Sequence, residues 1–162
     1  MMEKAVILSS GDELITGRVV DTNSSYIADK LYGLGLEVVA VLKVGDSRER
    51  LLWALRHGLE LGELVIGTGG LGPTTDDLTT EVVAGFFGRP LKMDEGVADA
   101  LKRRFASRGV EMTPNNLKQA LFPDGADIIP NPMGTAPGFR VATEDKKYLL
   151  WLSGVPREME VM

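Results

Sequence analysis

The chain has 162 residues, of which 44% are hydrophobic and 25% are charged, and its formal net charge is −5 at pH 7. These values are typical of one globular domain that buries a sizeable core. The negative charge argues against nucleic-acid binding, which calls for a basic face, and no apolar stretch approaches the length of a membrane span. The chain contains no cysteine, which excludes disulfides, thiol catalysis and cysteine-based zinc sites. We therefore expect a cytoplasmic protein that binds neither nucleic acid nor membrane.

Apolar runs in the first part of the chain predict three strands, at Lys4–Leu8, Leu36–Val44 and Leu64–Ile66. The run Lys4–Leu8 is continuously apolar, which suits a strand buried on both faces of a parallel sheet. A loop rich in Gly, Asp and Thr is expected over residues 9–21. Helical spacing predicts two helices between the strands, through Tyr26, Ile27, Leu31 and Leu34 and through Leu51, Leu52, Leu55 and Leu59. Asn23 or Ser24 is a candidate N-cap of the first helix, and Asp46 or Ser47 of the second.

The second half continues with helices predicted over residues 77–87 and 97–109 and a short helical piece that opens at Pro114. Short β-type segments follow at residues 127–129, 139–142 and 148–152, and a helix begins at Arg157. Strands that alternate with helices predict an α/β fold with a doubly wound, mostly parallel sheet. The final helix has little to pack against by itself. We therefore interpret residues 1–162 as one domain from the N-terminal part of a longer chain.

The segment LVIGTGGLGPTTDDLTTE, residues 64–81, carries the strongest functional signal. It places four glycines within six residues between a strand and a helix, where backbone N–H groups can converge on an anion. Two adjacent carboxylates, Asp76 and Asp77, would repel a bound phosphate unless a divalent cation sat between them. The segment therefore predicts a phosphate ester or anhydride held with Mg²⁺, Mn²⁺ or Co²⁺.

Other interpretations of this segment fit less well. Gly67, Gly69 and Gly72 match G-x-G-x-x-G, but the motif follows the third strand and no acidic strand end lies about 20 residues further on. A Walker A loop is excluded because the required lysine is missing. A simple connection with Asp76 or Asp77 as helix N-cap explains one aspartate and leaves the other, with the excess of glycine, unexplained.

Three further segments are candidates for the same site, because the carboxyl ends of parallel strands meet at one edge of a sheet. Glu13 lies in a loop bounded by glycines after the first strand. Asp21 and Asn23 either cap the first helix or bind a ribose or adenine. The segment 132–138 is rich in Gly and Pro, so it either lines a phosphate path or forms an ordinary turn.

Five motifs in order carry a resemblance to a known family. They are Gly11–Leu14, Asp21–Ser24, Thr68–Thr79, Asn131–Gly138 and Ser153–Met159. Together they resemble the N-terminal domain of the competence/damage-inducible CinA family. The resemblance covers nearly the whole chain and implies the three-layer α/β/α, molybdopterin-binding fold of MogA and MoaB. It also implies metal-dependent ADP-ribose pyrophosphatase activity, whereas nicotinamide mononucleotide deamidation belongs to a C-terminal domain that nothing here matches.

The resemblance and the residues together define a candidate site. Asp77, Asp76 and Glu13 are the candidate catalytic groups, with Asp76 and Asp77 as metal ligands and Glu13 as a further ligand or general base. The candidate substrate- and phosphate-binding residues are Gly11, Asp21, Asn23, Thr68, Gly69, Gly70, Gly72, Pro73, Thr74, Gly134, Thr135, Ala136, Pro137, Ser153 and Gly154.

Three functions remain open from the sequence. The first is hydrolysis of a nucleotide pyrophosphate such as ADP-ribose, and the second is binding or adenylyl transfer of a pterin phosphate in molybdenum cofactor biosynthesis. The third is nucleotide sensing without catalysis. In each case the partner is a small phosphorylated molecule, and we expect a homo-oligomer.

Overall fold

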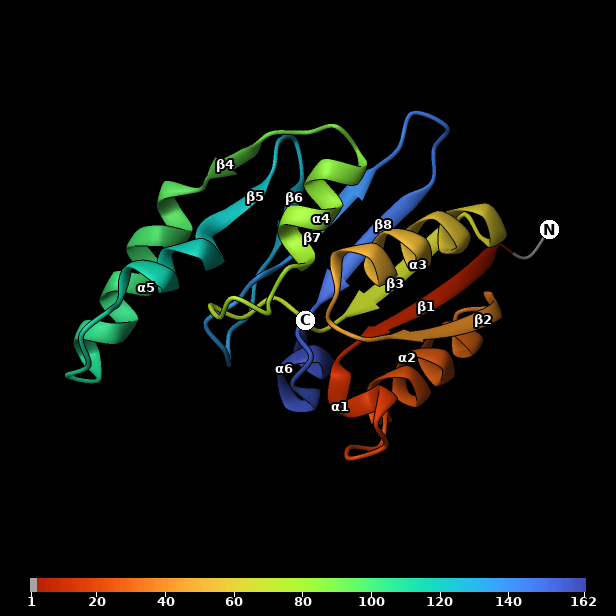
Figure 1. Ribbon diagram of the computed structural model, residues 1–162, viewed down its shortest axis with the longest axis horizontal. Coiled ribbons are helices and arrows are strands. Elements are labelled where there is room, and N and C mark those ends of the chain that lie inside the picture. Colours follow the sequence, from red (N-terminus) through yellow and green to blue (C-terminus); the bar gives the residue numbers. More distant parts are fainter. Residues whose placement is uncertain (1–2) are drawn as a thin grey trace.

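The computed structural model describes residues 3–162 and places a six-stranded sheet at the centre of the molecule (Figure 1). The sheet order is β2-β1-β3-β8-β7-β6. The first four strands in that order pair in parallel, and the last two pairs are antiparallel. The strands of this sheet are β1 (Lys4–Ser10), β2 (Glu37–Val44), β3 (Leu64–Thr68), β6 (Asp127–Ile129), β7 (Gly138–Ala142) and β8 (Tyr148–Leu152). The three strands predicted in the first part of the chain are therefore parallel neighbours, as expected.

Helices cover both faces of this sheet, which confirms the three-layer α/β/α fold. The alternation along β1 shows the two faces. Val6 and Leu8 belong to the core cluster on the side of α3 and α4, whereas Ala5 and Ile7 belong to the cluster on the side of α2 and α6. These helices are α2 (Thr22–Gly33), α3 (Arg48–Leu61), α4 (Thr79–Phe86) and α6 (Pro156–Val161).

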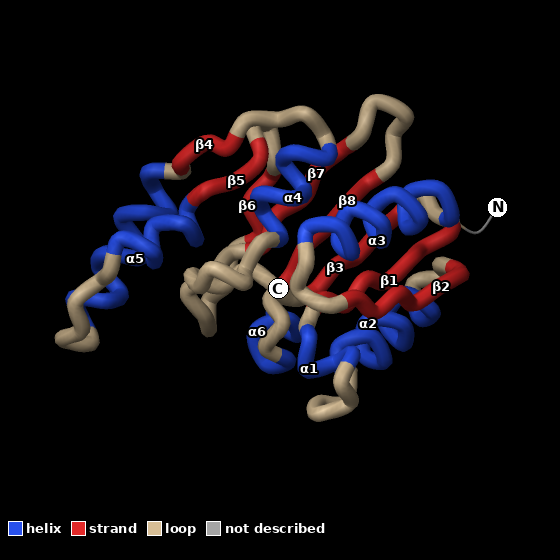
Figure 2. The backbone as a smooth tube through the Cα atoms, viewed as in Figure 1, coloured by secondary structure: helices blue, strands red, loops and turns tan. Residues whose placement is uncertain are grey.

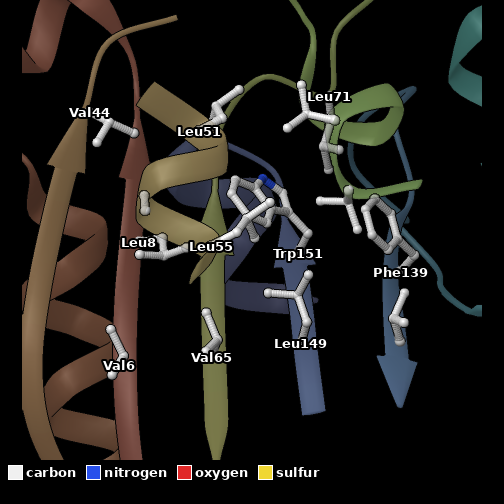
Figure 3. Packing of buried hydrophobic residues seen from close by; sticks show 14 of the residues in the cluster. Val6, Leu8, Val44, Leu51, Leu55, Val65, Leu71, Phe139, Leu149 and Trp151 are labelled. Carbon is white, nitrogen blue, oxygen red and sulfur yellow. The ribbon is translucent and has the colours of Figure 1, made fainter. Parts of the chain in front are cut away.

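The larger core cluster lies between the sheet and helices α3 and α4. Figure 3 shows Leu51 and Leu55 of α3 over Val65 and Trp151, which come from neighbouring strands of the sheet. Trp151 is completely buried, and its ring occupies the space that a side chain at position 67 would need, so Gly67 is required inside β3.

A small unit projects from one end of the sheet (Figure 1). It consists of the two-stranded sheet β4 (Leu91–Met93) and β5 (Leu121–Pro123), helix α5 (Glu95–Ser107) and the 3-10 helix η1 (Pro114–Ala120). Ala98, Leu101 and Ala120 form its own small core. The sequence predicted α5 and η1 but not the two strands, in which Lys92 and Pro123 weaken the β-type pattern.

The structure corrects two element boundaries near the site. The loop expected over residues 9–21 contains the short helix α1 (Asp12–Ile15). Helix α4 begins at Thr79, and its N-cap is Leu78 with no side-chain hydrogen bond. The interpretation of Asp76 or Asp77 as an N-cap is therefore wrong. In the part of the chain that the structure describes, no helix has the length and apolar character needed to span a bilayer.

Candidate functional site

A cavity of about 580 Å³ opens at the carboxyl ends of β1, β3 and β8. Figure 2 shows the loops that follow these strands gathered near helices α1 and α6. Gly11, after β1, and Gly70, after β3, both line this cavity. The expected convergence of the glycine loop and the first loop at one edge of the sheet is therefore observed.

Most of the predicted site residues line this main cavity. They are Gly11, Glu13, Asp21, Asn23, Thr68, Gly69, Gly70, Gly72, Pro73, Thr74, Asp76, Asp77, Thr135, Ala136, Ser153 and Gly154. Gly134 and Pro137 do not. They line a separate cavity of about 320 Å³ beside α5, and the Gly134 N–H donates to Asn131 Oδ1 at 2.7 Å. The assignment of Gly134 and Pro137 to phosphate binding is therefore not supported by their position.

Gly69 anchors the glycine loop to the protein. Its N–H donates to the Leu152 carbonyl oxygen at 3.2 Å. Its own carbonyl oxygen accepts from Trp151 Nε1 at 2.7 Å and from Thr79 Oγ1 at 3.1 Å. Gly69 has φ +98°, and a Cβ there would collide with the Ser10 carbonyl oxygen. Its N–H is therefore occupied and unavailable to an anion, contrary to the expectation that Gly69 contributes to the nest.

The next three residues have free backbone N–H groups instead. Among the described residues, no acceptor takes the backbone N–H of Gly70, Leu71 or Gly72, and all three residues line the main cavity. Gly70 has φ +66°, and a Cβ there would collide with Thr79 Oγ1, so the turn requires glycine. Successive free N–H groups at the end of a strand are the usual means by which backbone binds phosphate. We call Gly70–Gly72 the nest.

Asp77 closes the far side of the loop. Its Oδ2 accepts from the Thr74 N–H at 2.9 Å and from Thr74 Oγ1 at 2.6 Å. Lys118 of η1 reaches the same segment, and its Nζ donates to the carbonyl oxygens of Thr74 at 3.2 Å and of Asp77 at 2.5 Å. The small projecting unit therefore holds the segment that carries Asp77 next to the loop.

Asp21 is the N-cap of α2, a role that the sequence had left open. Its Oδ1 accepts from the Ser24 N–H at 3.0 Å and its Oδ2 from Ser24 Oγ at 2.5 Å. Burial alone would raise the pKa of the Asp21 carboxyl, but the hydrogen bonds from Ser24 and Ser9 and the charge of Lys43 hold it below its ordinary value. Asn23, one residue into α2, donates from Nδ2 to the Gly154 carbonyl oxygen at 2.9 Å.

The loop between β6 and β7 is held by side chains that the sequence analysis did not identify. Asn131 donates from Nδ2 to the Ala136 carbonyl oxygen at 3.0 Å and to Glu158 Oε2 at 2.8 Å. Glu158 Oε2 also accepts from Ser153 Oγ at 2.7 Å, and Arg104 donates to the carbonyl oxygens of Met133 and Gly134. This network places Thr135 and Ala136 at the edge of the main cavity.

The loop after β1 is closed by a reciprocal pair of aspartates. The Asp12 N–H donates to Asp46 Oδ2 and the Asp46 N–H donates to Asp12 Oδ1, both at 3.1 Å. Asp46 Oδ1 accepts from Ser10 Oγ at 2.8 Å. Glu13, the next residue, is exposed and lines the cavity. Its position agrees with the prediction that its carboxylate reaches the site.

The described residues contain no group of three or more His, Asp or Glu side chains placed to hold a metal ion. Asp76 and Asp77 nevertheless line the cavity together beside the nest. Mg²⁺ usually keeps several waters and binds through one or two carboxylates and the phosphates of the substrate. The donor set therefore fits an ion shared with a bound phosphate and does not form an all-protein cage.

Several cavity residues were missed by the sequence analysis, among them Asp46, Leu71, Gln119 and Glu158. Gln119 is one of several polar residues in a short 3-10 helix, and nothing in its local pattern distinguishes it from a surface glutamine. Glu158 stands inside the final motif, Ser153–Met159, and that motif was the only signal that could have identified it.

The comparison with known families agrees with this geometry. The family described as "Probable molybdopterin binding domain" matches residues 6–162. A crystal structure of CinA from Thermoplasma acidophilum, a protein described as having unknown function, superposes with a TM-score of 0.88 at 39% identity, over 99% of this chain and 93% of that one. The chain is a molybdopterin-binding-type domain of the CinA family. The resemblance seen in the motifs is thereby confirmed.

Curated relatives are longer than this chain. A CinA-like protein of Anaeromyxobacter sp. (strain Fw109-5) is 50% identical over 94% of this chain, which spans 37% of that protein. A Halothermothrix orenii protein named as competence-damage inducible is 46% identical over 98% of this chain, which spans 38% of its length.

A more distant structure shows the shared fold. MoaB of Pyrococcus furiosus, described as synthesising the tungsten cofactor, has a TM-score of 0.62 at 16% identity, over 98% of this chain and 86% of that one. At this level of identity the likeness establishes the MoaB-like fold alone.

Proposed function

We propose that the main cavity binds a nucleotide pyrophosphate of the ADP-ribose type and that the chain hydrolyses it. The observation that carries the proposal is the nest, three successive free N–H groups in a cavity that Asp76 and Asp77 also line. A nest alone suits any phosphate, but carboxylates beside it suit a substrate whose charge is shared with a divalent cation.

The residues of the site then have distinct roles. The nest N–H groups bind the phosphate oxygens and stabilise the charge that develops on them. A divalent cation held by Asp76 and Asp77 would neutralise phosphate charge and make a bound water more acidic. Glu13, which lines the same cavity, would accept a proton from a water molecule as the water oxygen bonds to one phosphorus. The bond between that phosphorus and the bridging oxygen breaks, and the products are AMP and ribose 5-phosphate.

A second candidate is binding or adenylyl transfer of a pterin phosphate. The family match over residues 6–162 favours it, because that family is described by molybdopterin binding. The nest and Asp77 would serve the same purpose there, with the phosphate of the pterin in place of one phosphate of the pyrophosphate.

The proposal is tested by incubating the purified chain separately with ADP-ribose, with other nucleotide pyrophosphates, and with a pterin phosphate plus ATP. Each mixture contains Mg²⁺, Mn²⁺ or Co²⁺, and the products are identified by mass spectrometry. AMP released from ADP-ribose without added pterin supports hydrolysis. Adenylylated pterin with intact ADP-ribose would instead establish the second candidate. Tight binding of a nucleotide with no product at all would indicate a sensing domain and contradict both enzymatic functions.

A further inference from the structure

Two buried amide side chains in the main cavity each keep one polar atom without a partner. They are Asn23 and Gln119, and the atoms are Asn23 Oδ1 and Gln119 Oε1. Each residue is 6% exposed. Every other buried side-chain nitrogen or oxygen among the described residues has a partner. Because buried polar groups are almost always satisfied in folded proteins, an unsatisfied pair in one cavity requires an explanation.

The orientation of the Asn23 amide is fixed by its one hydrogen bond. Nδ2 donates to the Gly154 carbonyl oxygen at 2.9 Å. A carbonyl oxygen only accepts, so the amide cannot be turned over without losing this bond. The free atom of Asn23 is therefore an acceptor, and it requires a ligand that donates.

Gln119 is less restricted. Its Nε2 donates to Thr135 Oγ1 at 3.1 Å. A hydroxyl both donates and accepts, so Gln119 can turn its amide over and keep this bond. It therefore keeps either an acceptor or a donor free beside the cavity.

The two amides lie on different sides of the glycine loop. Gly154, the partner of Asn23, packs against Gly69, since a Cβ at position 154 would come within 3.1 Å of Gly69 Cα. Lys118, the neighbour of Gln119, binds the Thr74–Asp77 side of the loop. In Figure 1 helix α2, which carries Asn23, and the teal segment η1, which carries Gln119, lie on opposite sides of the C-terminal end of β3. Along the loop, the nest lies between Gly69, on the side of Asn23, and Thr74–Asp77, on the side of η1.

An apolar surface accompanies Asn23 alone. Val19 and Val20, 51% and 80% exposed, line the cavity just before the segment that carries Asn23. Exposed valines at the mouth of a polar cavity suit a flat apolar ring. No comparable exposed apolar residue stands beside Gln119 in η1.

We propose that the cavity is built for a two-ended phosphate compound, with Asn23 and Gln119 as its specificity-determining residues. The phosphates occupy the nest, Asn23 accepts a hydrogen bond from a nucleoside, and Gln119 binds the hydroxyls of a second, sugar-like group on the other side. This inference rests on the proposed function in that both use the same nest. It goes further in assigning each end of the substrate to one residue.

Calorimetric titration of the chain and two variants with three ligands tests the assignment. The ligands are the α,β-methylene analogue of ADP-ribose, which resists cleavage, ADP, which lacks the sugar end, and ribose 5-phosphate, which lacks the nucleoside. Asn23→Ala should raise Kd for the analogue and for ADP by about 10-fold, the value expected for one hydrogen bond, and leave Kd for ribose 5-phosphate unchanged. Gln119→Met should raise Kd for the analogue and for ribose 5-phosphate and leave Kd for ADP unchanged.

Asn115→Ala is the matched control, because Asn115 is an exposed amide of η1 outside the cavity. It should leave all three affinities unchanged. If Asn23→Ala fails to fold, the wild-type protein is titrated instead with two analogues of ADP. One is 2′,3′-dideoxy-ADP, and the other lacks the 6-amino group of the adenine. One of the two should then bind about 10-fold more weakly than ADP.

The outcomes separate this inference from the proposed function. Equal losses for all three ligands, or no loss in either variant, would overturn the assignment of the two ends and leave phosphate binding intact. A wild-type chain that binds none of the three ligands would overturn the proposed function and this inference with it.

Discussion

Asp77 receives both hydrogen bonds from Thr74 on a single carboxylate oxygen, Oδ2. Asp77→Asn can keep both bonds on its one amide oxygen, so the free energy of unfolding should fall by less than about 1 kcal/mol. The variant loses the formal charge that a cation beside the phosphates requires. Turnover should therefore fall by about 100-fold or more, with a weaker response to added metal.

Asp99→Asn is the control for this change, because Asp99 is exposed on α5 and, among the described residues, pairs with Lys102 alone. It should leave turnover unchanged. Thermal melting and metal-dependent turnover of the two variants are compared with the wild type. An Asp77→Asn protein with wild-type melting and wild-type turnover would show that Asp77 takes no part in catalysis.

Asp21 makes stability depend on acid pH. Its pKa in the folded protein lies below the ordinary value near 3.8 because its hydrogen bonds and Lys43 favour the charged form. A lowered carboxyl pKa contributes stability above the unfolded pKa, and this contribution is lost as the pH falls below about 3.8 towards the folded value. Between pH 6 and pH 3, the free energy of unfolding in urea should fall more steeply for the wild type than for Asp21→Asn, in which asparagine remains an acceptable N-cap. Parallel pH profiles would contradict this.

At the scale of elements, the 3-10 helix η1 positions the glycine loop through Lys118. Lys118→Met keeps the length of the side chain and removes both hydrogen bonds to the carbonyl oxygens of Thr74 and Asp77. We expect Kd for the methylene analogue of ADP-ribose to rise at least about 10-fold, because a small shift of binding groups has large effects. Lys102→Met, on the exposed face of α5, should bind as the wild type does. Equal affinities of both variants would show that η1 does not hold the loop.

Elements that carry an apolar run or a helical spacing were predictable from the sequence. The runs that became β1, β2 and β3 alternate with helices, and this alternation favours parallel pairing. Helix α1, with four residues, and β4 and β5, with three each, contain charged residues or a proline that weaken such a pattern. Of the predicted nest residues Gly69, Gly70 and Gly72, only Gly69 is excluded, because its N–H pairs with Leu152, a residue 83 positions away in the sequence (152 − 69). Long-range hydrogen bonds of this kind leave no local signal.

At the scale of the whole molecule, the charge of −5 predicts no binding to duplex DNA or RNA. A fluorescent 20-base-pair duplex should show no change in anisotropy with the chain at physiological salt. A rise in anisotropy that gives a binding constant falling linearly with the logarithm of salt concentration would contradict this. The expectation of a homo-oligomer stays a prediction that sedimentation of the same sample tests.

The central claim is that the free N–H groups of Gly70, Leu71 and Gly72 bind the phosphates of a nucleotide pyrophosphate. The chain has a mass of 17.5 kDa, so its amide signals can be followed by NMR during titration with the methylene analogue of ADP-ribose. We predict large shifts for these three amides and a small one for Gly69, whose N–H is already paired with Leu152. Saturable binding that leaves the three amides unshifted would place the phosphates elsewhere and contradict the account.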